Sequence, residues 1–201
     1  LTFVQTESAK TWPILEDEDH HRGFLHRLDV PSSGLILAAK SYEAYYDLRV
    51  QLSAGNIARD YVVLCHGWVP CHRREIKARV AWKGNWATRS GPQGKPCCSR
   101  LIVLAHASQE EDALSLVAIR IETGRRHQIR SHTSHIGHPT ACDGKYTALA
   151  THRSDRELCA WNFLHRYRIA FQDGAGIGHE VMRPLPVHLA NSLQHVVGKD
   201  R

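Results

Sequence analysis

The sequence predicts an α+β domain in which a β-sheet dominates, and three observations support this prediction. Short apolar or alternating segments of strand length recur along the chain, separated by glycine and proline turn signals. Only two segments carry signals typical of helices. No change in composition marks a boundary, so we expect the 201 residues to form a single domain.

Local patterns predict the elements in the first half of the chain. The apolar run at residues 34–40 (GLILAAK) predicts a buried strand. Ser41 is a favourable N-cap and Gly55 a favourable stop, so we expect a helix between them. Residues 61–69 predict a second strand, and residues 75–82 predict an alternating third strand.

Turn signals divide the second half. Residues 91–96 (GPQGKP) are a strong turn signal, so we expect the segments on either side to form a hairpin. A helix of about three turns is expected from residues 123–124 to a stop at Gly137. Residues 174–178 predict a turn before a segment at 181–186. Further strands are predicted at residues 100–106, 113–121 and 165–171.

The charge balance favours polyanionic partners. The chain carries 26 Lys and Arg against 20 Asp and Glu, a net charge of +6, and it has 15 histidines. The opening stretch, with an acidic cluster at residues 16–19, is expected to be a solvated loop. The 6 cysteines form no C-x-x-C pair, which predicts free thiols in a reducing compartment. No apolar run reaches the roughly 18 residues that a membrane span needs, so we expect no membrane partner.

Two segments place charges among apolar neighbours. In residues 25–35, Asp29 precedes a Pro-Ser-Ser-Gly turn, where a buried carboxylate needs a cation or hydrogen bonds. In residues 124–130, Arg126 and Arg130 are four apart, so on a helix they share one face. Taken singly, each segment has a structural interpretation: a loop carboxylate that caps the turn, and a solvated basic face.

Together the motifs resemble one family. Residues 26–29 (HRLD) and 33–35 (SGL) match the pattern H-R-L-D-x-x-T-S-G-L. Residues 59–61 (RDY) with Gly67 resemble K-x-Y…G, the next pattern along the chain. Both patterns are those of the RluA-type RNA pseudouridine synthases.

Two further motifs follow in the family's order. Residues 124–130 (GRRHQIR), then 137–139 (GHP), Asp143 and Tyr146 resemble G-R-T-H-Q-I-R…G-H-P-I-x-G-D-x-x-Y. The closing pattern L-H-A-x-R-L…A-P-L-P is matched by Leu164, His165, Arg168 and residues 184–186. Four motifs in order identify the chain as similar to this family far more specifically than any one motif.

The resemblance implies a fold and an activity. The expected fold is a mixed, mainly antiparallel sheet with flanking helices and loops around a central RNA-binding cleft, with residues 1–201 as a single catalytic domain. Such enzymes detach uracil from ribose at N1 and rejoin it through C5, which makes pseudouridine within RNA. They need neither cofactor nor metal. We expect ribosomal or transfer RNA as the partner, a monomer, and an intracellular, reducing compartment.

The resemblance also implies roles for three residues in the reaction. Asp29 is the catalytic carboxylate, acting as a nucleophile or as an electrostatic partner. Arg130 holds that carboxylate ionised and oriented. Tyr61 stacks on the flipped uracil and exchanges a proton near C5.

Six more residues are expected to bind the substrate. Ile129 would pack on the other side of the base, and His26 with Arg27 would face the RNA backbone or fill the gap that the flipped nucleotide leaves. The remaining three, expected to support the site or contact phosphate, are Arg125, His127 and Gln128.

Departures from the family patterns concern RNA contacts more than chemistry. Ser32 stands where the pattern has Thr, Arg59 where it has Lys and Arg126 where it has Thr. Residues 140–142 (TAC) stand where the pattern has an apolar residue and a glycine. Residues 1–24 show neither the leading strands with K-P-x-G nor a small N-terminal RNA-binding domain. The chain is therefore interpreted as a trimmed or shortened member.

Two alternatives belong to other functional classes. His132, His135 and His138 are three apart and could together hold zinc, but H-E-x-x-H is absent and no carboxylate lies among them, so no metal is expected. A weak or inactive RNA-binding module on the same fold is the second alternative. Stacking tryptophans would suit such a module, but core packing is the favoured interpretation for Trp68, Trp82 and Trp86.

Overall fold

The computed structural model describes residues 12–84, 87–109, 112–194 and 196–199. Its strands are β1 (Ser33–Gly34), β2 (Ala58–His66), β3 (Glu75–Ala81), β4 (Arg89–Ser90), β5 (Lys95–Gln109), β6 (Asp112–Ile121), β7 (Leu164–Gln172), β8 (Gly178–Met182) and β9 (Val197–Lys199). Its helices are the 3₁₀ helices η1 (Pro13–Glu16) and η2 (His21–Gly23) and the α-helices α2 (Tyr42–Ala54), α3 (Gln128–His135), α4 (Leu149–Leu158) and α5 (Val187–Gln194).

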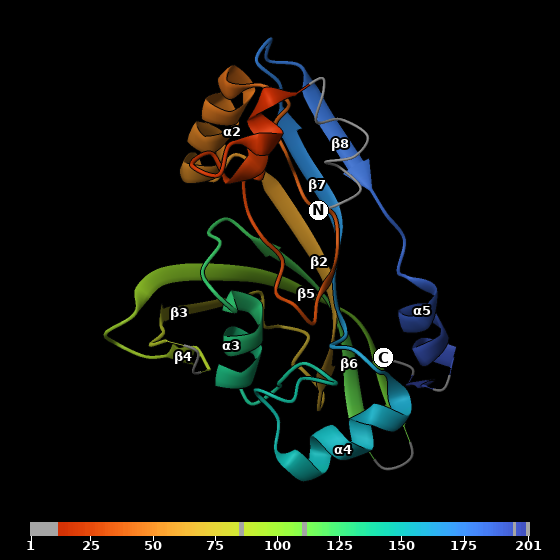
Figure 1. The fold of residues 1–201 in the computed structure, drawn as a ribbon. Coiled ribbons are helices and arrows are strands. Elements are labelled where there is room, and N and C mark those ends of the chain that lie inside the picture. Colours follow the sequence, from red (N-terminus) through yellow and green to blue (C-terminus); the bar gives the residue numbers. More distant parts are fainter. Residues whose placement is uncertain (1–11, 85–86, 110–111, 195, 200–201) are drawn as a thin grey trace.

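All of these strands belong to one sheet, in which the order is β1-β7-β2-β6-β5-β3-β4 (Figure 1). β8 pairs with β7 and β9 pairs with β5. Every pairing is antiparallel except that of β1 with β7. The predicted α+β class and the mixed, mainly antiparallel sheet are therefore confirmed.

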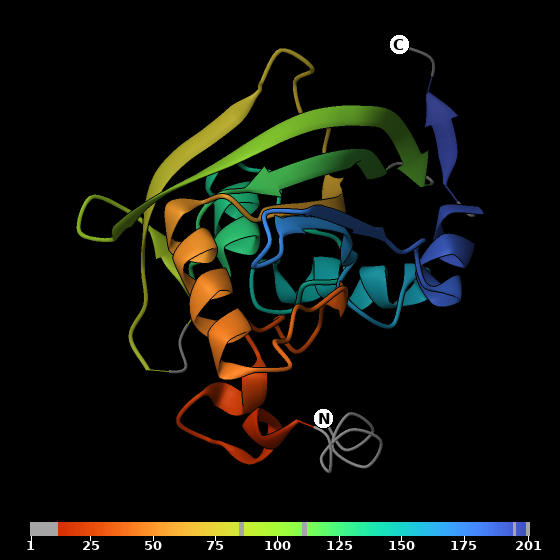
Figure 2. The same cartoon turned by 90° about the horizontal axis from the view of Figure 1, so that it is seen from above.

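Helices cover the sheet on several sides, and β2 runs through its middle (Figures 1 and 2). Seven successive residues of β2 are buried, because apolar clusters lie against both of its faces. Tyr61 and Val63 join the cluster that includes Ile129 of α3. Leu64 points the other way and joins a cluster with Leu158 of α4 and Leu189 of α5.

A third apolar cluster holds α2 against the far end of the sheet. Tyr45 and Leu48 of α2 pack there with Ile169 of β7 and with Ile14 and Leu25 from the opening segment. The expected solvated loop is thus wrong for residues 12–22, because η1 buries two apolar side chains. Residues 1–11 lie outside the described part of the chain.

The helix expected after Ser41 is confirmed. The Ser41 hydroxyl accepts the Ala44 N–H at 3.2 Å, and Gly55 ends α2 with a φ of 78°. This region of φ favours glycine because a Cβ would be strained there. Both signals are local, which explains why the sequence alone predicts the helix well.

The buried strand expected at residues 34–40 is wrong, because only Ser33 and Gly34 pair with β7. From Arg168 onward, β8 pairs with β7 and leaves no backbone for a longer β1. The chain instead continues as an extended segment in which Ile36 is 43% exposed.

The predicted strands on either side of residues 91–96 do pair antiparallel, as β3 and β5. The connection between them is more complex than a simple hairpin turn, because it contains β4, which pairs with the opposite side of β3. Gly94 crosses close to the end of β3, where a Cβ would come within 2.4 Å of the Val80 backbone. The connection therefore wraps around β3, which a local signal does not reveal.

The helix expected from residues 123–124 begins later, at Gln128. The Gln128 side chain accepts the Arg125 N–H at 3.0 Å and the Thr123 hydroxyl at 2.9 Å, which folds the preceding segment into a loop. His127 has a left-handed φ of 51°. Consequently Arg126 lies outside the helix and does not share a helix face with Arg130, contrary to the prediction.

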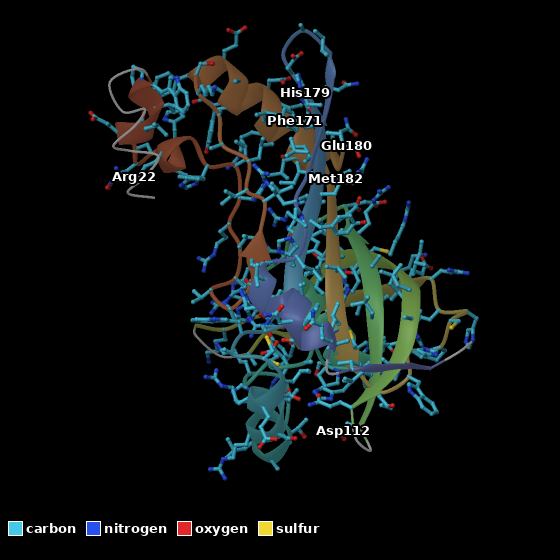
Figure 3. The ribbon with its side chains drawn as sticks, turned by 90° about the vertical axis from the view of Figure 1, so that its right-hand side faces the viewer. Arg22, Asp112, Phe171, His179, Glu180 and Met182 are labelled. Atoms are coloured by element: carbon cyan, nitrogen blue, oxygen red, sulfur yellow. The ribbon has the colours of Figure 1, made fainter. Side chains whose placement is uncertain are left out.

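The C-terminal part contains elements that the sequence did not predict, namely α4, α5 and β9. The predicted turn after β7 leads into β8, whose five residues are all exposed. Figure 3 shows this edge, where Phe171 and His179 stack with ring centroids 5.4 Å apart. No helix in the described part of the chain is long and apolar enough to cross a membrane.

We predict that Gly34→Ala lowers the free energy of unfolding by about 3 kcal/mol. Gly34 has a φ of 119°, and a Cβ there would lie 2.3 Å from the Arg166 carbonyl oxygen. Urea unfolding measures the loss. Gly174→Ala is the control, because nothing lies within 4 Å of its Cβ position. Equal stability of the two variants would contradict the tight approach of β1 to β7.

Candidate active site

A cavity of about 650 Å³ opens between the loop before β1, α2, β2 and the loop before α3. Its lining is strongly basic, with six arginines and two carboxylates. Eight of the nine residues predicted from the sequence to form the site line this cavity: His26, Arg27, Asp29, Tyr61, Arg125, His127, Gln128 and Ile129. Arg130, the ninth, lies beside Asp29.

The two carboxylate oxygens of Asp29 have different surroundings. Its Oδ2 accepts a hydrogen bond from Arg130 Nη1 at 3.3 Å. Its Oδ1 has no hydrogen-bond donor among the described residues and lies 4.0 Å from His127 Nε2. The Asp29 side chain is 19% exposed and does not cap the following turn, which the Asp29 carbonyl closes instead.

Arg130 is held by a second carboxylate that lies deeper. Its Nε and Nη2 donate to the two oxygens of Asp143 at 2.6 and 2.7 Å, a bidentate pair. The side chain of Asp143 is fully buried, and that of Arg130 is 4% exposed. Thr140 and Asn162 also donate to Asp143, so the buried charge is well satisfied.

This pairing keeps Arg130 charged. Burial alone lowers the pKa of its guanidinium, but the hydrogen bonds from Arg130 to Asp143 and the charges of Asp143 and Asp29 outweigh burial and raise the pKa. The third guanidinium nitrogen, Nη1, is the one that reaches Asp29. Asp143 therefore fixes the plane of the guanidinium, and the guanidinium in turn orients Asp29.

Tyr61 is buried in the cavity wall and bound by an arginine. Arg166 donates to the Tyr61 hydroxyl through Nε at 2.7 Å and also through Nη2, and its guanidinium lies 4.9 Å from the ring centroid. A β-bulge brings the two residues together, because the register shifts between Asp60 and Tyr61. Because of the bulge, Arg168, two residues later, points away from the cavity and binds Asp60.

Two further basic residues lie beside Tyr61. Arg59 is 3% exposed and donates to the Glu122 carbonyl. His26 lies 2.9 Å from Arg166 through Nδ1. Burial, together with the charges of Arg166 and Arg59, lowers the pKa of His26 to about 3, so this imidazole is neutral at physiological pH.

The other predicted substrate-binding residues divide into a wall and a rim. Gln128 is buried and donates to the Cys98 carbonyl, which makes it a structural part of the loop. Ile129 is 4% exposed and packs in the same cluster as Tyr61. His127 binds the Tyr146 hydroxyl at 2.9 Å. The pKa of His127 is lowered, because burial outweighs the opposing effect of the Asp29 charge. Arg27 is exposed at the rim.

Two of the three histidines considered as zinc ligands have other partners. His132 is fully buried, with Nδ1 2.9 Å from the Ser99 hydroxyl and Nε2 3.1 Å from the Ala78 carbonyl. His138 binds the His66 carbonyl. Among the described residues no group of three or more potential ligands could hold a metal ion.

Core packing is wrong for two of the tryptophans. Trp68 is 54% exposed and Trp82 is 41% exposed. Trp82 instead lies under an ammonium group, with Lys95 Nζ 5.6 Å from its ring. Trp86 lies outside the described residues.

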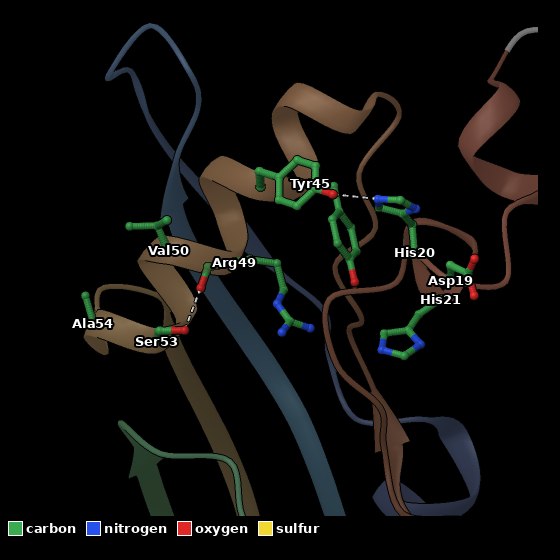
Figure 4. A pocket seen from close by; sticks show the side chains of 9 residues that line it. Asp19, His20, His21, Tyr45, Arg49, Val50, Ser53 and Ala54 are labelled. Carbon is green, nitrogen blue, oxygen red and sulfur yellow. Dashed lines mark hydrogen bonds between the residues drawn. The ribbon is translucent and has the colours of Figure 1, made fainter.

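A second hollow, of about 800 Å³, adjoins the first and is more open to solvent (Figure 4). Arg49 and Ser53 of α2 line both. In this hollow His20 binds the Tyr46 hydroxyl at 2.8 Å and meets Tyr45 edge to face. The two hollows together make a basic and aromatic surface along one side of α2.

Sequence reasoning did not assign roles to Asp143, Arg59 or Arg166. Asp143 matched a motif, and its burial is what gives it importance. Arg166 stands at the alanine of the pattern L-H-A-x-R-L, so a departure from that pattern was the available signal. The bulge that turns Arg166 into the cavity has no local signature.

The geometry defines a class of site: a carboxylate held by a buried arginine, in a basic cavity that a tyrosine also lines. The family model described as RNA pseudouridylate synthase matches residues 4–135. The chain therefore belongs to the RNA pseudouridylate synthase family, which confirms the resemblance seen in its motifs.

Curated relatives carry the name ribosomal large subunit pseudouridine synthase C. The protein of Haemophilus influenzae is 33% identical over 179 residues, which cover 86% of this chain and 53% of the relative. The protein of Escherichia coli K12 is 31% identical over 206 residues, which cover 96% of this chain and 61% of the relative. The chain thus spans between half and two thirds of these relatives.

Solved structures agree with this assignment. Human RNA pseudouridylate synthase domain containing 1 superposes with a TM-score of 0.75 at 26% identity, covering 88% of this chain and 74% of that chain. Human RNA pseudouridylate synthase domain containing 4 has a TM-score of 0.67 at 17% identity and shares the fold.

We predict that Asp143→Asn destabilises the protein by about 3–5 kcal/mol, because it leaves the Arg130 guanidinium buried without its charged partner. Urea unfolding measures the loss. Asp19→Asn is the control, since Asp19 is exposed, its side chain has no hydrogen bond or ion pair with another described residue, and the change should alter stability by only about 0.5 kcal/mol. Similar small losses in both variants would show that Asp143 does not carry the ion pair.

We predict that His26→Gln reduces the loss of stability in acid. An unfolded histidine takes up a proton near pH 6.5, whereas His26 in the folded protein does so only near its pKa of about 3. Between these values the unfolded state binds more protons, so stability falls as the pH falls. Unfolding measured from pH 7 to 4 should show a flatter profile for the variant. His72→Gln, at an exposed position, should retain the parent's slope.

Proposed function

We propose that this chain isomerises uridine to pseudouridine in RNA, with Asp29 as the catalytic carboxylate. The observation that carries the proposal is the arrangement of Asp29, Arg130 and Asp143 behind a cavity that Tyr61 also lines. Family membership supports the same activity. The curated relatives are named for the large ribosomal subunit. The RNA of that subunit is therefore the first substrate to test, and transfer RNA is the second.

The cavity suits a nucleotide that has left the RNA helix. Its arginines attract the phosphate backbone, and Ile129 with Leu164 supplies an apolar wall against which a base can pack. Arg49 extends the basic surface over α2 toward the second hollow. The described elements share one sheet, which supports treating residues 1–201 as one catalytic unit.

The chemistry follows from the positions of these groups. Oδ1 of Asp29 is free to approach the sugar while Arg130 holds Oδ2. The bond from N1 to C1′ breaks, and its electron pair stays with the base. After the base turns, C5 bonds to C1′, the hydrogen on C5 leaves as a proton, and N1 takes up a proton. Tyr61 stands beside the base, where its hydroxyl can relay the proton from C5.

We predict that Asp29→Asn abolishes tritium release from RNA that carries tritium at uracil C5. Release reports the reaction directly, because bonding through C5 must expel that hydrogen. Asn keeps the size of the side chain but removes the charge, so the melting temperature should stay close to that of the parent. Asp173→Asn, at a position outside the cavity lining, should release tritium at the parent's rate.

Each outcome of this experiment decides between the two functions. Release by the parent and by the Asp173 variant, with none from the Asp29 variant, supports the enzyme. RNA binding without release by the parent would favour the alternative, a binding module on the same fold. Release by the Asp29 variant would remove the mechanism.

A further inference from the structure

Two buried arginines beside Tyr61 have no carboxylate partner among the described residues. Arg59 and Arg166 are each 3% exposed, and both line the cavity. The hydrogen bond from Arg59 goes to the Glu122 carbonyl, and its Nε is buried without a partner. Arg166 binds the Tyr61 hydroxyl, His26 and the Leu35 carbonyl, none of which is a carboxylate.

Such an arrangement leaves positive charge uncompensated at one end of the cavity. A buried cation is costly unless an anion faces it. The carboxylates that line the cavity are Asp29 and Glu122. Asp29 binds Arg130, and Glu122 forms an ion pair with Arg100 at 2.9 Å. His26, which contacts Arg166, adds no positive charge at physiological pH, because burial and the two arginines lower its pKa to about 3.

The position of the two arginines indicates which anion they meet. They flank Tyr61, and the neighbouring cavity wall is formed by Ile129 and Leu164. An apolar wall with a tyrosine suits the base rather than a phosphate group. Uracil is neutral while it is bonded to ribose. When the bond from N1 to C1′ breaks, the electron pair makes it an anion, with the charge spread over N1, O2 and O4.

We propose that Arg166, assisted by Arg59, is a further catalytic residue that stabilises the uracil anion as it leaves C1′. The proposal rests on the proposed function. The positive charge is matched by negative charge only once the bond begins to break, so the interaction lowers the barrier rather than tightening substrate binding. The charge is neutralised again when C5 bonds to C1′ and N1 takes up a proton.

The test measures single-turnover tritium release together with RNA affinity. Arg166→Gln should slow release at saturating enzyme by roughly 10²-fold, as loss of a preorganised donor to a developing anion does, while the Kd for RNA stays near that of the parent. Arg166→Lys should lose less, because it keeps the charge. Arg168→Gln is the matched control: it lies two residues along the same strand and binds Asp60 outside the cavity lining.

A second substrate separates charge stabilisation from mere support of Tyr61. RNA containing 5-fluorouridine carries a more acidic base, which leaves more readily as an anion. Nuclease digestion and chromatography measure the loss of the N-glycoside. With this substrate Arg166→Gln should slow the loss, relative to the parent, much less than it slows the reaction of uridine. A variant that only disturbs Tyr61 would slow both substrates equally, and that result would overturn the proposal.

Other outcomes are equally decisive. If Arg166→Gln raises the Kd and lowers the salt dependence of binding by about one charge, with an unchanged rate at saturation, Arg166 contacts phosphate and the proposal is wrong. If Arg166→Gln does not fold, as judged by its melting curve, Arg59→Gln must show the same dependence on the leaving group. An absence of release by the parent would refute the proposed function itself before any variant is compared.

Discussion

The buried ion pair between Arg130 and Asp143 is the interaction on which the site depends. It joins α3 to the loop that follows it, and both partners are almost free of contact with water. Two charges can lie there only because the pair is bidentate and because Thr140 and Asn162 satisfy the remaining acceptor sites of the carboxylate. The third guanidinium nitrogen of Arg130, Nη1, is not used in this pair and donates a hydrogen bond to Asp29. The orientation of a half-buried loop carboxylate thus depends on a contact deeper in the molecule.

Electrostatics divide the cavity into two ends. At one end Arg130 lies between two carboxylates, those of Asp29 and Asp143. At the other end Arg166 donates to the Tyr61 hydroxyl and Arg59 to the Glu122 carbonyl, and neither arginine has a carboxylate partner among the described residues. A reaction that begins and ends with a neutral base but passes through an anion can use such an imbalance, because the field acts most strongly at the barrier. The sheet supplies the rigidity, since Tyr61 and its neighbours belong to its most deeply buried strand.

The sequence predicted those parts of the fold that local signals determine. Ser41 and Gly55 delimit α2 because capping depends on adjacent backbone, and the alternation in β7 marks a half-buried strand. Pairing was harder to predict. Residues 34–40 look like a strand, yet β8 occupies the edge they would need. The motifs located the loop of Asp29 and the helix of Arg130, whereas Arg166 required knowledge of a register shift, which arises from contacts between distant segments.

The bulge in β7 also gives two arginines of one strand different surroundings. On one side of it Arg168 joins Asp60, Arg120 and Glu180 in an ion-pair network across the sheet surface. On the other side Arg166 lines the cavity and donates to the Tyr61 hydroxyl. In a regular strand both arginines would point to the same face of the sheet, and a substitution near one would also affect the other. The one extra residue gives the two arginines different partners, so a change in the surface ion-pair network need not disturb the contacts of Arg166 in the cavity.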